Sequence, residues 1–581
     1  MKVKLCYTKS LLLLFAVLLG LSSCSKEDDA KLLEPQITLD SKEGTYMVKV
    51  GKSITITPTY ENVDGAIYAW KLDGKVISND PTITFSSNEV GQYYLSLIVI
   101  TNAGEVFKDV TVTVASLVPP TISMIVPEDG FKIIKGGVLA FKPTVQGDST
   151  STKFDWTVNG SSSASTKSYN FSQSTVGTYT VKLATSNEDG KDELSFKVQV
   201  CNASDLPFSW TFDQTECNMS LGRTIRIKAW DIVNDFGGTY TWSVDGTQKQ
   251  TGSQTYYLFT GSSVGKHKVT VKMKNAYTEE SQDIIVNVCP AEGTYQRPVT
   301  ASSNKLSNKV YEFMAAPGQF TNQGYTATTM EKAVEYATRR LGQEAYVSLG
   351  GYGGYLVVGF DHSVVNDGSY NLEILGNSFA GSSEPGIVYV MQDENGNGLP
   401  DDTWYELAGS ETAKGNVIYD YSITYYKPSA PGMNTQWKDN QGNTGTVDYN
   451  NFHRQDYYYP SWAPKNTLTF HGTCLPANSK ETSPGYWYNT EYEWGYVDNF
   501  SPIDRLTTDI NYGAAANGNH FRISDAIDYK GNHVSLKYID FVKVATSVNS
   551  KAGWLGEVST EVFQVRDFNI IKSQVKSNRG R

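Results

Sequence analysis

A tryptophan motif recurs three times in the first half of the chain, at positions 70, 156 and 242, which are 86 residues apart. It reads Trp70-Lys-Leu-Asp-Gly, then Trp156-Thr-Val-Asn-Gly, then Trp242-Ser-Val-Asp-Gly, and a Val-Gly step and alternating strand-like segments follow each copy. A fixed period predicts repeated structural units. Strands of this length and turn spacing within about 85 residues predict small β-sandwiches.

The predicted domain boundaries follow from these repeats. After the third repeat, Pro290 and Pro298 flank a segment beyond which the period is lost. The remaining chain is long enough to bury one core of its own, and a jelly-roll-like β-sandwich with long loops is predicted for it. The four predicted domains are residues 36–117, 118–202, 203–290 and 291–581.

Within residues 291–581 the pattern predicts mostly strands and one helix. The helix is expected from Thr328 or Thr329 to Leu341, because a Thr can cap its start and Gly342 can stop it. Its apolar stripe would be Met330, Val334, Ala337 and Leu341. The expected strands are Leu356–Phe360, Leu372–Leu375, Ile387–Met391, Ile418–Tyr426, Leu468–Phe470, Val534–Val544 and Val558–Val565.

The three repeats resemble PKD-like immunoglobulin-type domains. That family's pattern is Trp-x-Phe-Gly-Asp-Gly, and here it is shortened to Trp-x-(Leu/Val)-(Asp/Asn)-Gly over residues 36–290. The resemblance implies that the three domains are spacers that hold a functional domain away from a surface, with each Trp packed in the core between two sheets. Some domains of this family bind glycans or other proteins, which is the alternative. The all-β class predicted for the whole chain is therefore three tandem PKD/Ig-like sandwiches followed by a larger sandwich.

The N-terminus has the pattern of a lipoprotein signal peptide. Three lysines precede an apolar run from Leu11 to Leu21, which is too short to span a bilayer and ends in Leu21-Ser-Ser-Cys24. Residues 1–23 are predicted to be removed, with Cys24 acylated and residues 24–35 forming an acidic tether. A cleaved signal without lipid is the alternative. Ser25-Lys-Glu-Asp-Asp29 is similar to the export signal of Bacteroidota surface lipoproteins, which implies an outer-membrane, lipid-anchored protein facing the exterior.

Charge and cysteine content exclude other classes. A net charge of −11 and a pI near 5.2 argue against nucleic-acid binding, which needs a basic face. Beyond Cys6 and Cys24, four cysteines remain, and their spacing predicts neither a zinc site nor a disulfide framework. Cys201 and Cys289 end equivalent strands and are expected to be buried, although a Cys217–Cys289 bridge is the alternative.

One loop has the spacing of an oxygen-ligand site for Ca²⁺. Asp393, Asn395, Asn397, the Leu399 carbonyl and Asp401 fall at positions 1, 3, 5, 7 and 9 of an EF-hand-like loop, with Gly398 at the sharp turn. Position 12 is Trp404, so Asp402 or Glu406 would have to complete the shell. The preceding segment is strand-like, which predicts a structural calcium loop between strands. An Asn/Gly-rich turn without metal is the alternative.

The stretch from Trp404 to Phe500 is unusually aromatic, and consecutive loop side chains point different ways. Some rings are therefore expected to line a binding surface, although rings that pack the loops onto the sandwich are the alternative. No catalytic residue and no enzyme activity are predicted. The sequence has no metal-binding histidine spacing, no nucleophile elbow and no dinucleotide fingerprint. The candidate ligand contacts are His453, Tyr457, Tyr458, Tyr459, Trp462, Trp487 and Trp494.

Several blocks of residues 300–565 resemble the C-terminal domain of Bacteroidota surface lipoproteins with PKD-like domains, a group that includes cobalamin-binding lipoproteins. They are Val310 to Phe320, Leu349-Gly-Gly-Tyr-Gly-Gly-Tyr355, Gly376 to Gly386, Asp393 to Glu406 and Leu555 to Glu561. The resemblance implies a non-catalytic binder that captures cobalamin and passes it to a TonB-dependent transporter. A glycan-binding lipoprotein of a polysaccharide-uptake system is the alternative, and an enzyme or an adhesin is a more remote one.

Overall fold

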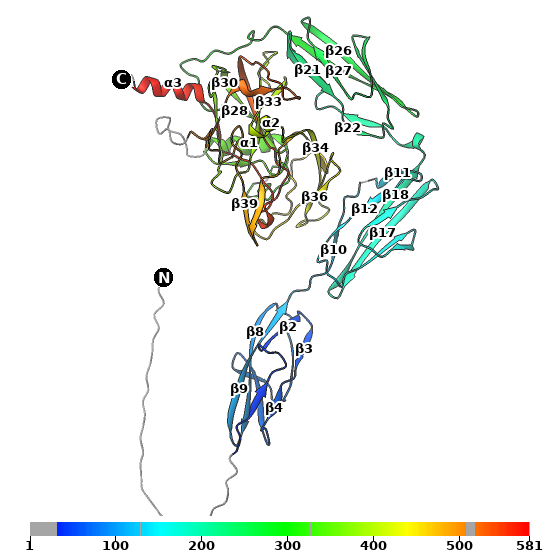
Figure 1. Ribbon diagram of the computed structural model, residues 1–581, viewed down its shortest axis with the longest axis vertical. Coiled ribbons are helices and arrows are strands. Elements are labelled where there is room, and N and C mark those ends of the chain that lie inside the picture. Colours follow the sequence, from blue (N-terminus) through cyan, green and yellow to red (C-terminus); the bar gives the residue numbers. More distant parts are fainter. Residues whose placement is uncertain (1–31, 128, 326, 507–517, 580–581) are drawn as a thin grey trace, which may run out of the picture. The chain divides into compact units, whose positions relative to one another are not determined.

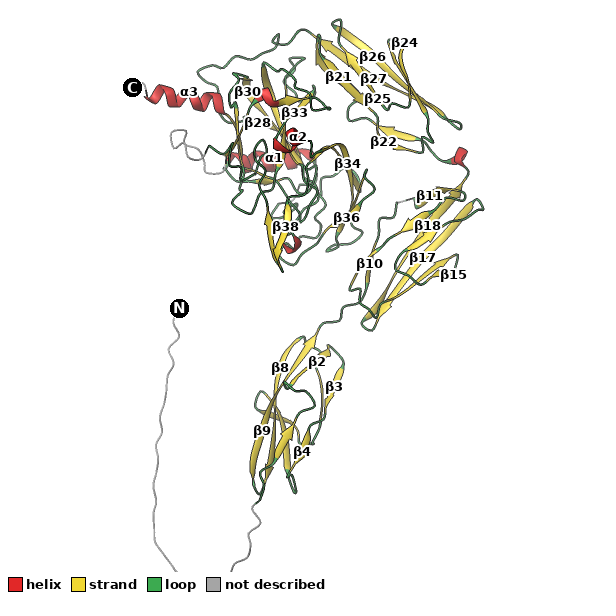
Figure 2. Ribbon diagram, in the orientation of Figure 1, coloured by secondary structure: helices red, strands yellow, loops and turns green. Residues whose placement is uncertain are grey.

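The computed structural model describes residues 32–579 except 128, 326 and 507–517 (Figure 1). The predicted signal peptide and Cys24 lie outside this range. The fold is nearly all β, as predicted (Figure 2). The chain divides into two units, residues 1–120 with 186–191, and residues 121–185 with 192–581. Among the described residues, none of the helices has the length and apolarity needed to cross a membrane.

The three repeats share one strand topology. In each, a five-stranded sheet packs with two two-stranded sheets. Within the five-stranded sheet, the strand that comes first in the chain pairs in parallel with the strand that comes last in the chain. Domain 1 contains β1 (Gln36–Thr38), β2 (Thr45–Lys49), β3 (Ser53–Ile56), β4 (Thr59–Glu61), β5 (Ile67–Leu72), β6 (Lys75–Ser78), β7 (Ile83–Ser86), β8 (Gly91–Thr101) and β9 (Gly104–Ala115). Domain 2 contains β10 (Thr121–Ser123), β11 (Phe131–Ile134), β12 (Leu139–Phe141), β13 (Thr144–Gln146), β14 (Lys153–Val158), β15 (Ser161–Ala164), β16 (Tyr169–Phe171), β17 (Gly177–Asn187) and β18 (Gly190–Cys201). Domain 3 contains β19 (Ser209–Thr211), β20 (Glu216–Ser220), β21 (Thr224–Lys228), β22 (Trp230–Val233), β23 (Thr239–Val244), β24 (Thr247–Gly252), β25 (Tyr256–Thr260), β26 (Gly265–Lys274) and β27 (Glu279–Cys289).

The repeated motif does the same structural work in each domain. Trp70, Trp156 and Trp242 have no exposed surface, and each indole N–H donates to a backbone carbonyl ten or twelve residues further on. The Asp-Gly or Asn-Gly pair that follows has positive φ at both residues. A two-residue type I′ hairpin turn requires positive φ at both central residues, and Asp-Gly and Asn-Gly adopt that conformation most readily. The motif therefore places one core ring and one tight hairpin per domain.

Residues 291–581, called the head below, fold around one main core. Its largest sheet has six antiparallel strands in the order β28-β30-β42-β32-β33-β41, and a four-stranded sheet has the order β36-β35-β34-β37. The strands are β28 (Lys309–Met314), β29 (Val347–Ser348), β30 (Tyr355–Val365), β31 (Leu372–Leu375), β32 (Gly386–Met391), β33 (Trp404–Leu407), β34 (Ile418–Tyr426), β35 (Thr435–Asp439), β36 (Thr444–Val447), β37 (Thr467–Cys474), β38 (Ser479–Ser483), β39 (Tyr486–Asn489), β40 (Gly518–Phe521), β41 (Ala526–Ile527), β42 (Tyr538–Thr546), β43 (Glu561–Val562) and β44 (Gln564–Asp567).

The predicted helix is α1 (Met330–Gly342), and its cap is the expected one, since the Thr329 side chain accepts a hydrogen bond from the Lys332 N–H. Its Ala337 and Leu341 are buried in the head core. Gly342, expected just beyond the end of the helix, is instead its last helical residue. The positive φ that follows the helix end is at Glu344.

Other expectations for the head need correction. Two helices were not predicted, α2 (Ser410–Lys414) and α3 (Phe568–Arg579). The segment expected from Val534 becomes a strand only at Tyr538. The segment 558–565 is not one strand, because the chain changes sheets at Phe563: β43 pairs with β29, and β44 pairs with β31. The other strands expected in the head lie within strands of the structure.

Candidate functional site

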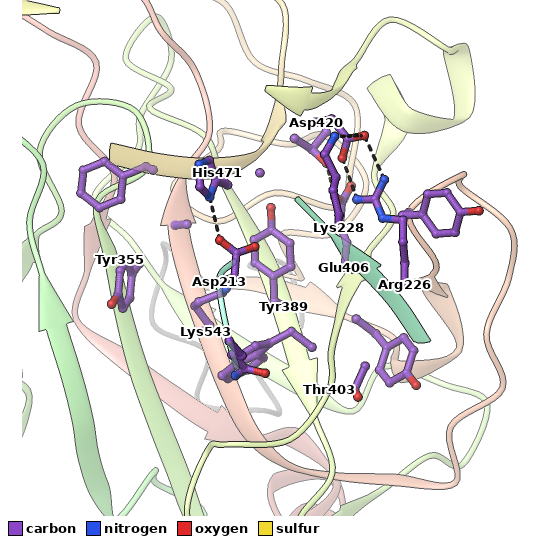
Figure 3. Close-up of a pocket in the computed structure, with 18 of the residues that line it drawn as sticks. Asp213, Arg226, Lys228, Tyr355, Tyr389, Thr403, Glu406, Asp420, His471 and Lys543 are labelled. Atoms are coloured by element: carbon purple, nitrogen blue, oxygen red, sulfur yellow. Dashed lines mark hydrogen bonds and ion pairs between the residues drawn. The ribbon is translucent and has the colours of Figure 1, made fainter. Parts of the chain in front are cut away.

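A cleft with a volume of about 630 Å³ lies where domain 3 meets the head (Figure 3). Both parts belong to the same compact unit of the chain. Domain 3 contributes residues of β21 and β22 together with the loop that contains Asp213. The head contributes residues of the six-stranded sheet and of β34 and β37. The aromatic rings of the lining are Phe212, Trp230, Tyr352, Tyr355, Tyr389, Trp404, Tyr405, Tyr419, Phe470, His471 and Tyr529.

The floor of the cleft is one face of the six-stranded sheet. A row of directly paired residues crosses five of its strands and lines the cavity: Glu312, Val357, Lys543, Tyr389 and Glu406. Residues that pair directly across antiparallel strands present their side chains on the same face. Strand pairing alone therefore brings together two carboxyl groups, an amine and a phenol from distant parts of the sequence.

The domain 3 wall comes from the alternation of β21. Its Ile225 and Ile227 are buried in the domain 3 core, so Arg226 and Lys228 face the other way. Both contact Asp420 of the head, Arg226 through Nη2 at 2.6 Å and Lys228 through Nζ at 2.8 Å. Burial opposes the charge of Asp420, but the hydrogen bonds from Arg226 and Lys228 hold its pKa below the usual value. This ion pair joins domain 3 to the head across the cleft.

His471 of β37 forms a second link between the two domains. Its ring stacks on Trp230, with centroids 4.2 Å apart, and its Nδ1 and Nε2 lie 2.7 Å from Asp213 and 3.2 Å from Asp231. Burial opposes the charge, yet the hydrogen bonds to Asp213 and Asp231 raise the pKa of His471 to about 9. The ring is therefore an imidazolium at neutral pH and has no lone pair to offer a metal.

We expect the stability of the unit formed by domain 3 and the head to depend on pH through His471. Because its folded-state pKa is about 9 and the unfolded value is about 6.5, its contribution is complete below pH 6.5 and is lost as the pH rises through 9. The loss is on the order of 3 kcal/mol. Urea denaturation at pH 6.5 and 9.5 checks this against His471→Phe, which keeps a ring beside Trp230. Equal pH dependence in the two proteins would contradict it.

Glu406, at the end of the row of paired residues, is a buried acid. The hydroxyl of Thr473 donates to its Oε2 at 2.5 Å, and its Oε1 has no partner among the described residues. Burial raises the pKa of Glu406 to about 7. At neutral pH Glu406 can therefore accept a hydrogen bond from a polar ligand group when it is ionised, or donate one when it is protonated.

The residues of the predicted calcium loop lie in the hairpin loop between β32 and β33, as expected from the strand-like segment before it. Asp393 is buried, and its carboxylate accepts the backbone N–H groups of Gly396, Asn397 and Gly398 at 2.8–3.1 Å. The side-chain amides of Asn395 and Asn397 donate to Asp401. Their side-chain oxygens accept the backbone N–H groups of Asn397 and Leu399. Carboxylate and amide oxygens, the ligand types that Ca²⁺ takes, thus lie within nine residues, and they accept hydrogen bonds within the loop.

Asp402 and Glu406 were the two candidates to complete the calcium shell, and they differ in position. Both line the cleft, but Glu406 lies on β33 and accepts the hydroxyl of Thr473, which is outside the loop. Asp402 Oδ2 accepts the Glu394 N–H, while its buried Oδ1 has no partner among the described residues. Burial, with the Glu394 charge, raises the pKa of Asp402 to about 8. Asp402 is thus the candidate beside the loop.

The same loop touches domain 3. The Asn218 side chain donates to the Asp401 carbonyl at 3.0 Å, and the Thr403 hydroxyl donates back to the Asn218 carbonyl at 3.0 Å. The Ser220 N–H donates to Glu394 at 3.0 Å. These bonds connect β20 to the loop, next to the cleft. The order of the loop and the position of domain 3 are therefore coupled through direct hydrogen bonds.

A second group of oxygen donors lies elsewhere in the head. Glu384, Asp498 and Glu561 have carboxylate oxygens within 4.8 Å of one another, and Asp498 and Glu561 are buried. Among the described residues, this is the group of three acidic, His or Cys side chains that lie close enough together to hold a metal ion. Burial, with the neighbouring carboxylates, raises the pKa of Glu384 to about 8. The cluster has backbone N–H donors from Glu561, Asn377 and Ser559.

The predicted aromatic binding surface needs correction. Tyr458, Tyr459 and Trp462 are 1–4% exposed and belong to the head core. The Trp462 indole donates to the Phe313 carbonyl at 3.0 Å, and the Tyr459 hydroxyl donates to the Lys465 carbonyl at 2.8 Å. Hydrogen bonds at the polar tips let the loop turn these rings inward, so they do not line a surface.

The other four predicted contacts do not line the main cleft. His453 and Tyr457 are half-buried, and His453 packs against the Phe320 ring. Trp487 is half-buried against Gly553. Trp494 lines a separate pocket of about 150 Å³ together with Tyr370 and His520. The structure therefore scatters the predicted contacts over several places.

The four described cysteines are free thiols. Cys217 pairs across its parallel strand with Val286, whereas Cys289 lies opposite Ser220. The possible Cys217–Cys289 bridge is therefore absent among the described residues. Burial raises the pKa of both thiols to about 11, so they are not reactive at neutral pH.

The cleft was missed because its residues follow no local motif. One signal was present in the repeats. The strand that begins with Thr224 carries Arg226 and Lys228, followed by Trp230, whereas the equivalent strand of domain 1, Ser53–Ile56, has no charged residue. A departure of one repeat from another marks a position that has a role outside the shared fold.

Comparison with known proteins identifies the repeats. The PKD-like domain family matches residues 34–101 and 119–187. The chain therefore carries PKD-like domains. Domain 3 lies outside these matches, but it has the same sheet topology. No curated protein matches the sequence.

The solved structures that are similar to this chain include tandem immunoglobulin-like and fibronectin-like domains. The fibronectin(III)-like modules of Clostridium thermocellum CbhA are 20% identical, with 30% of this chain and 97% of that chain covered and a TM-score of 0.19. Sidekick-1 immunoglobulin domains 1–5 are 12% identical, with 45% and 61% covered and a TM-score of 0.24. Three N-terminal domains of the bacteriophage RB49 outer capsid protein Hoc are 17% identical, with 44% and 97% covered and a TM-score of 0.21. TM-scores this low carry no conclusion about function.

Proposed function

We propose that this protein is a surface lipoprotein that binds an extracellular small molecule in the cleft between domain 3 and the head. The observation that carries the proposal is the cleft itself, about 630 Å³ in volume and lined by rings and by polar groups from both domains. Concave sites of this size with a few convergent polar groups are typical of small-molecule binding. The lipid on Cys24 would hold the protein on the outer membrane, and no catalytic step is part of the proposal.

The ligand that we propose first is cobalamin, passed on to a TonB-dependent transporter. The resemblance of the head to cobalamin-binding lipoproteins supports it. The chemistry of the cleft is compatible, because a corrin is a flat macrocycle with amide groups around its rim. Tyr389 and Trp404 offer ring faces, and Glu406 offers a carboxyl group that can bond an amide. Recognition would use the rim of the macrocycle, since protonated His471 cannot ligate cobalt.

A glycan is the second candidate, favoured by the number of aromatic rings in the lining. Tyrosine and tryptophan rings can stack on the apolar faces of pyranose sugars, and carboxylates and amines can bond their hydroxyls. Under this alternative the protein would serve a polysaccharide-uptake system, and the same cleft would hold the sugar.

We also propose that Asp393, Asn395, Asn397, the Leu399 carbonyl and Asp401 hold a structural Ca²⁺. The all-oxygen donors of the loop and the unpartnered Oδ1 of Asp402 beside it support this assignment. The ion would supply charge compensation and order, and it would take no part in any reaction. Through the Asp401–Asn218 contact, the ordered loop would hold domain 3 against the head.

A calorimetric titration of residues 25–581 with cyanocobalamin tests the proposed function. We expect one-to-one binding that weakens about tenfold or more in Tyr389→Ala and in Trp404→Ala, because each removes a ring face from the cleft. Trp554→Ala is the matched control, since Trp554 is exposed and does not line the cleft. Binding that both cleft variants retain in full would refute the assignment of the site. Absence of cyanocobalamin binding would direct the same titrations to oligosaccharides.

A further inference from the structure

Lys543 differs from the other cations of the cleft. Four cationic side chains line the cavity, and three of them have carboxylate partners: Arg226 and Lys228 pair with Asp420, and His471 pairs with Asp213. Within residues 32–579 as described, no ion pair or hydrogen bond joins the Lys543 Nζ to another group. Its three N–H donors are thus available to a ligand.

The position of Lys543 is fixed by strand pairing. It lies at the centre of the row of paired residues on the cleft floor, directly between Val357 and Tyr389. Its Nζ is 4.6 Å from the centroid of the Tyr389 ring and 5.0 Å from the centroid of the Trp404 ring. Figure 3 shows Lys543 and Tyr389 beside the same cavity. Ring faces attract a cation but accept no strong hydrogen bonds, so they leave its N–H groups unsatisfied.

The two carboxylates whose charges act on Lys543, Asp213 and Glu312, have other partners. Asp213 binds His471 at 2.7 Å, and Glu312 accepts the hydroxyl of Tyr355 at 2.9 Å. Burial lowers the pKa of Lys543, although the charges of Asp213 and Glu312 oppose this shift. Lys543 is half-buried and its ammonium group has no paired anion, so a bound anion would give it a charged hydrogen-bond partner within the cleft.

We propose that Lys543 is the anion anchor of the cleft and that the ligand carries a negatively charged oxygen group, a phosphodiester or a carboxylate. The inference rests on the proposed binding function of this cleft and specifies the class of its ligand. Tyr389 and Trp404 hold the ammonium group from its sides, so that its free N–H groups meet the anion. A cobalamin would supply the phosphodiester of its nucleotide loop, and an acidic glycan would supply a uronate carboxylate.

The first test uses inorganic phosphate and residues 25–581, so that it does not depend on the natural ligand. Thermal unfolding is followed at rising phosphate and constant ionic strength, with chloride as the balancing ion. A saturable rise in melting temperature of about 2 °C is expected for the wild type and for Lys543→Arg, and none for Lys543→Met. Lys309→Met is the matched control, because Lys309 lies 4.1 Å from the Tyr311 ring but outside the cleft. Equal responses in the wild type and Lys543→Met would overturn the anchor.

The second test separates the sources of the anion. Cyanocobalamin is compared with dicyanocobinamide, which has the amide-bearing macrocycle without the phosphodiester, and a galacturonate oligosaccharide is compared with its methyl ester. The wild type is expected to prefer the charged member of one pair at least tenfold, and Lys543→Met to lose that preference while Lys543→Arg keeps most of it. A wild-type preference that Lys543→Met retains would refute the anchor and leave the proposed function standing. A Lys543-dependent phosphate response without binding of any of the four compounds would refute the proposed ligands and leave the anchor standing.

Discussion

The head without domain 3 is expected to lose ligand binding even though it keeps its own core. We predict that residues 203–581 bind within about threefold of residues 25–581, whereas residues 291–581 bind at least a hundredfold more weakly, a difference of about 2.7 kcal/mol. The reason is that one wall of the cleft comes from β21 and β22. Calorimetric titration of the three forms, residues 25–581, 203–581 and 291–581, with the same ligand measures the effect.

The contacts between the domains explain the size of this effect. Without domain 3, Asp420 loses both of its cationic partners, and His471 loses Trp230, Asp213 and Asp231. Asp420 and His471, which are paired and partly buried in the full protein, become solvated and free to move. The head therefore no longer presents a preorganised site.

Two controls accompany the comparison. Circular dichroism and thermal unfolding should show that residues 291–581 still fold, since the head core contains no residue of domain 3. In the full protein, Asp420→Asn should weaken binding less than the truncation does, because it removes one link and leaves the wall in place. Equal affinity of residues 291–581 and residues 25–581 would mean that the ligand does not need the cleft.

Asp393→Ala is expected to destabilise the head by about 2–4 kcal/mol and to remove any effect of calcium on its stability. The buried carboxylate accepts three backbone N–H groups, and each of these hydrogen bonds contributes about 0.5–1.5 kcal/mol, because water can replace the carboxylate at the exposed Gly396 and Asn397. The proposed calcium ion would lose its first ligand as well. Denaturation in millimolar calcium and in chelator measures both effects in the wild type and the variant.

Asp439→Ala provides a matched control for Asp393. Asp439 is also buried, and its carboxylate accepts the N–H groups of Gln441 and Asn443 in another hairpin turn. Its loss should destabilise the protein and leave the calcium effect unchanged. A wild-type protein that unfolds identically in calcium and in chelator would sink the calcium assignment, whatever Asp393→Ala does to stability.

Local patterns predicted the parts of the fold that local interactions determine. The Trp repeat predicted a core ring in each domain, and Trp70, Trp156 and Trp242 are buried. Thr329 predicted the start of α1 through its capping oxygen. In each case the residues that interact are within a dozen positions of one another, so the pattern itself contains the contact.

The cleft depends on contacts between residues far apart in the chain. Arg226 and Asp420 are 194 positions apart, and His471 and Asp213 are 258 positions apart. No periodicity relates such residues. The sequence also did not predict that the aromatic side chains of these loops point into the core. Tyr458 and Trp462 turn inward through hydrogen bonds to backbone carbonyls, and composition does not specify these carbonyls. The charged strand of domain 3 was the available clue, and it becomes informative only when the repeats are compared with one another.

The measurement that tests the account most directly is amide hydrogen exchange of residues 25–581 with and without saturating cyanocobalamin. The account predicts slower exchange in β21, β22, β37 and β42, which surround the cleft on both sides, and unchanged exchange in domain 1. Protection confined to the loops near Trp487 and Trp554, or no protection in any segment, would contradict a ligand site between domain 3 and the head.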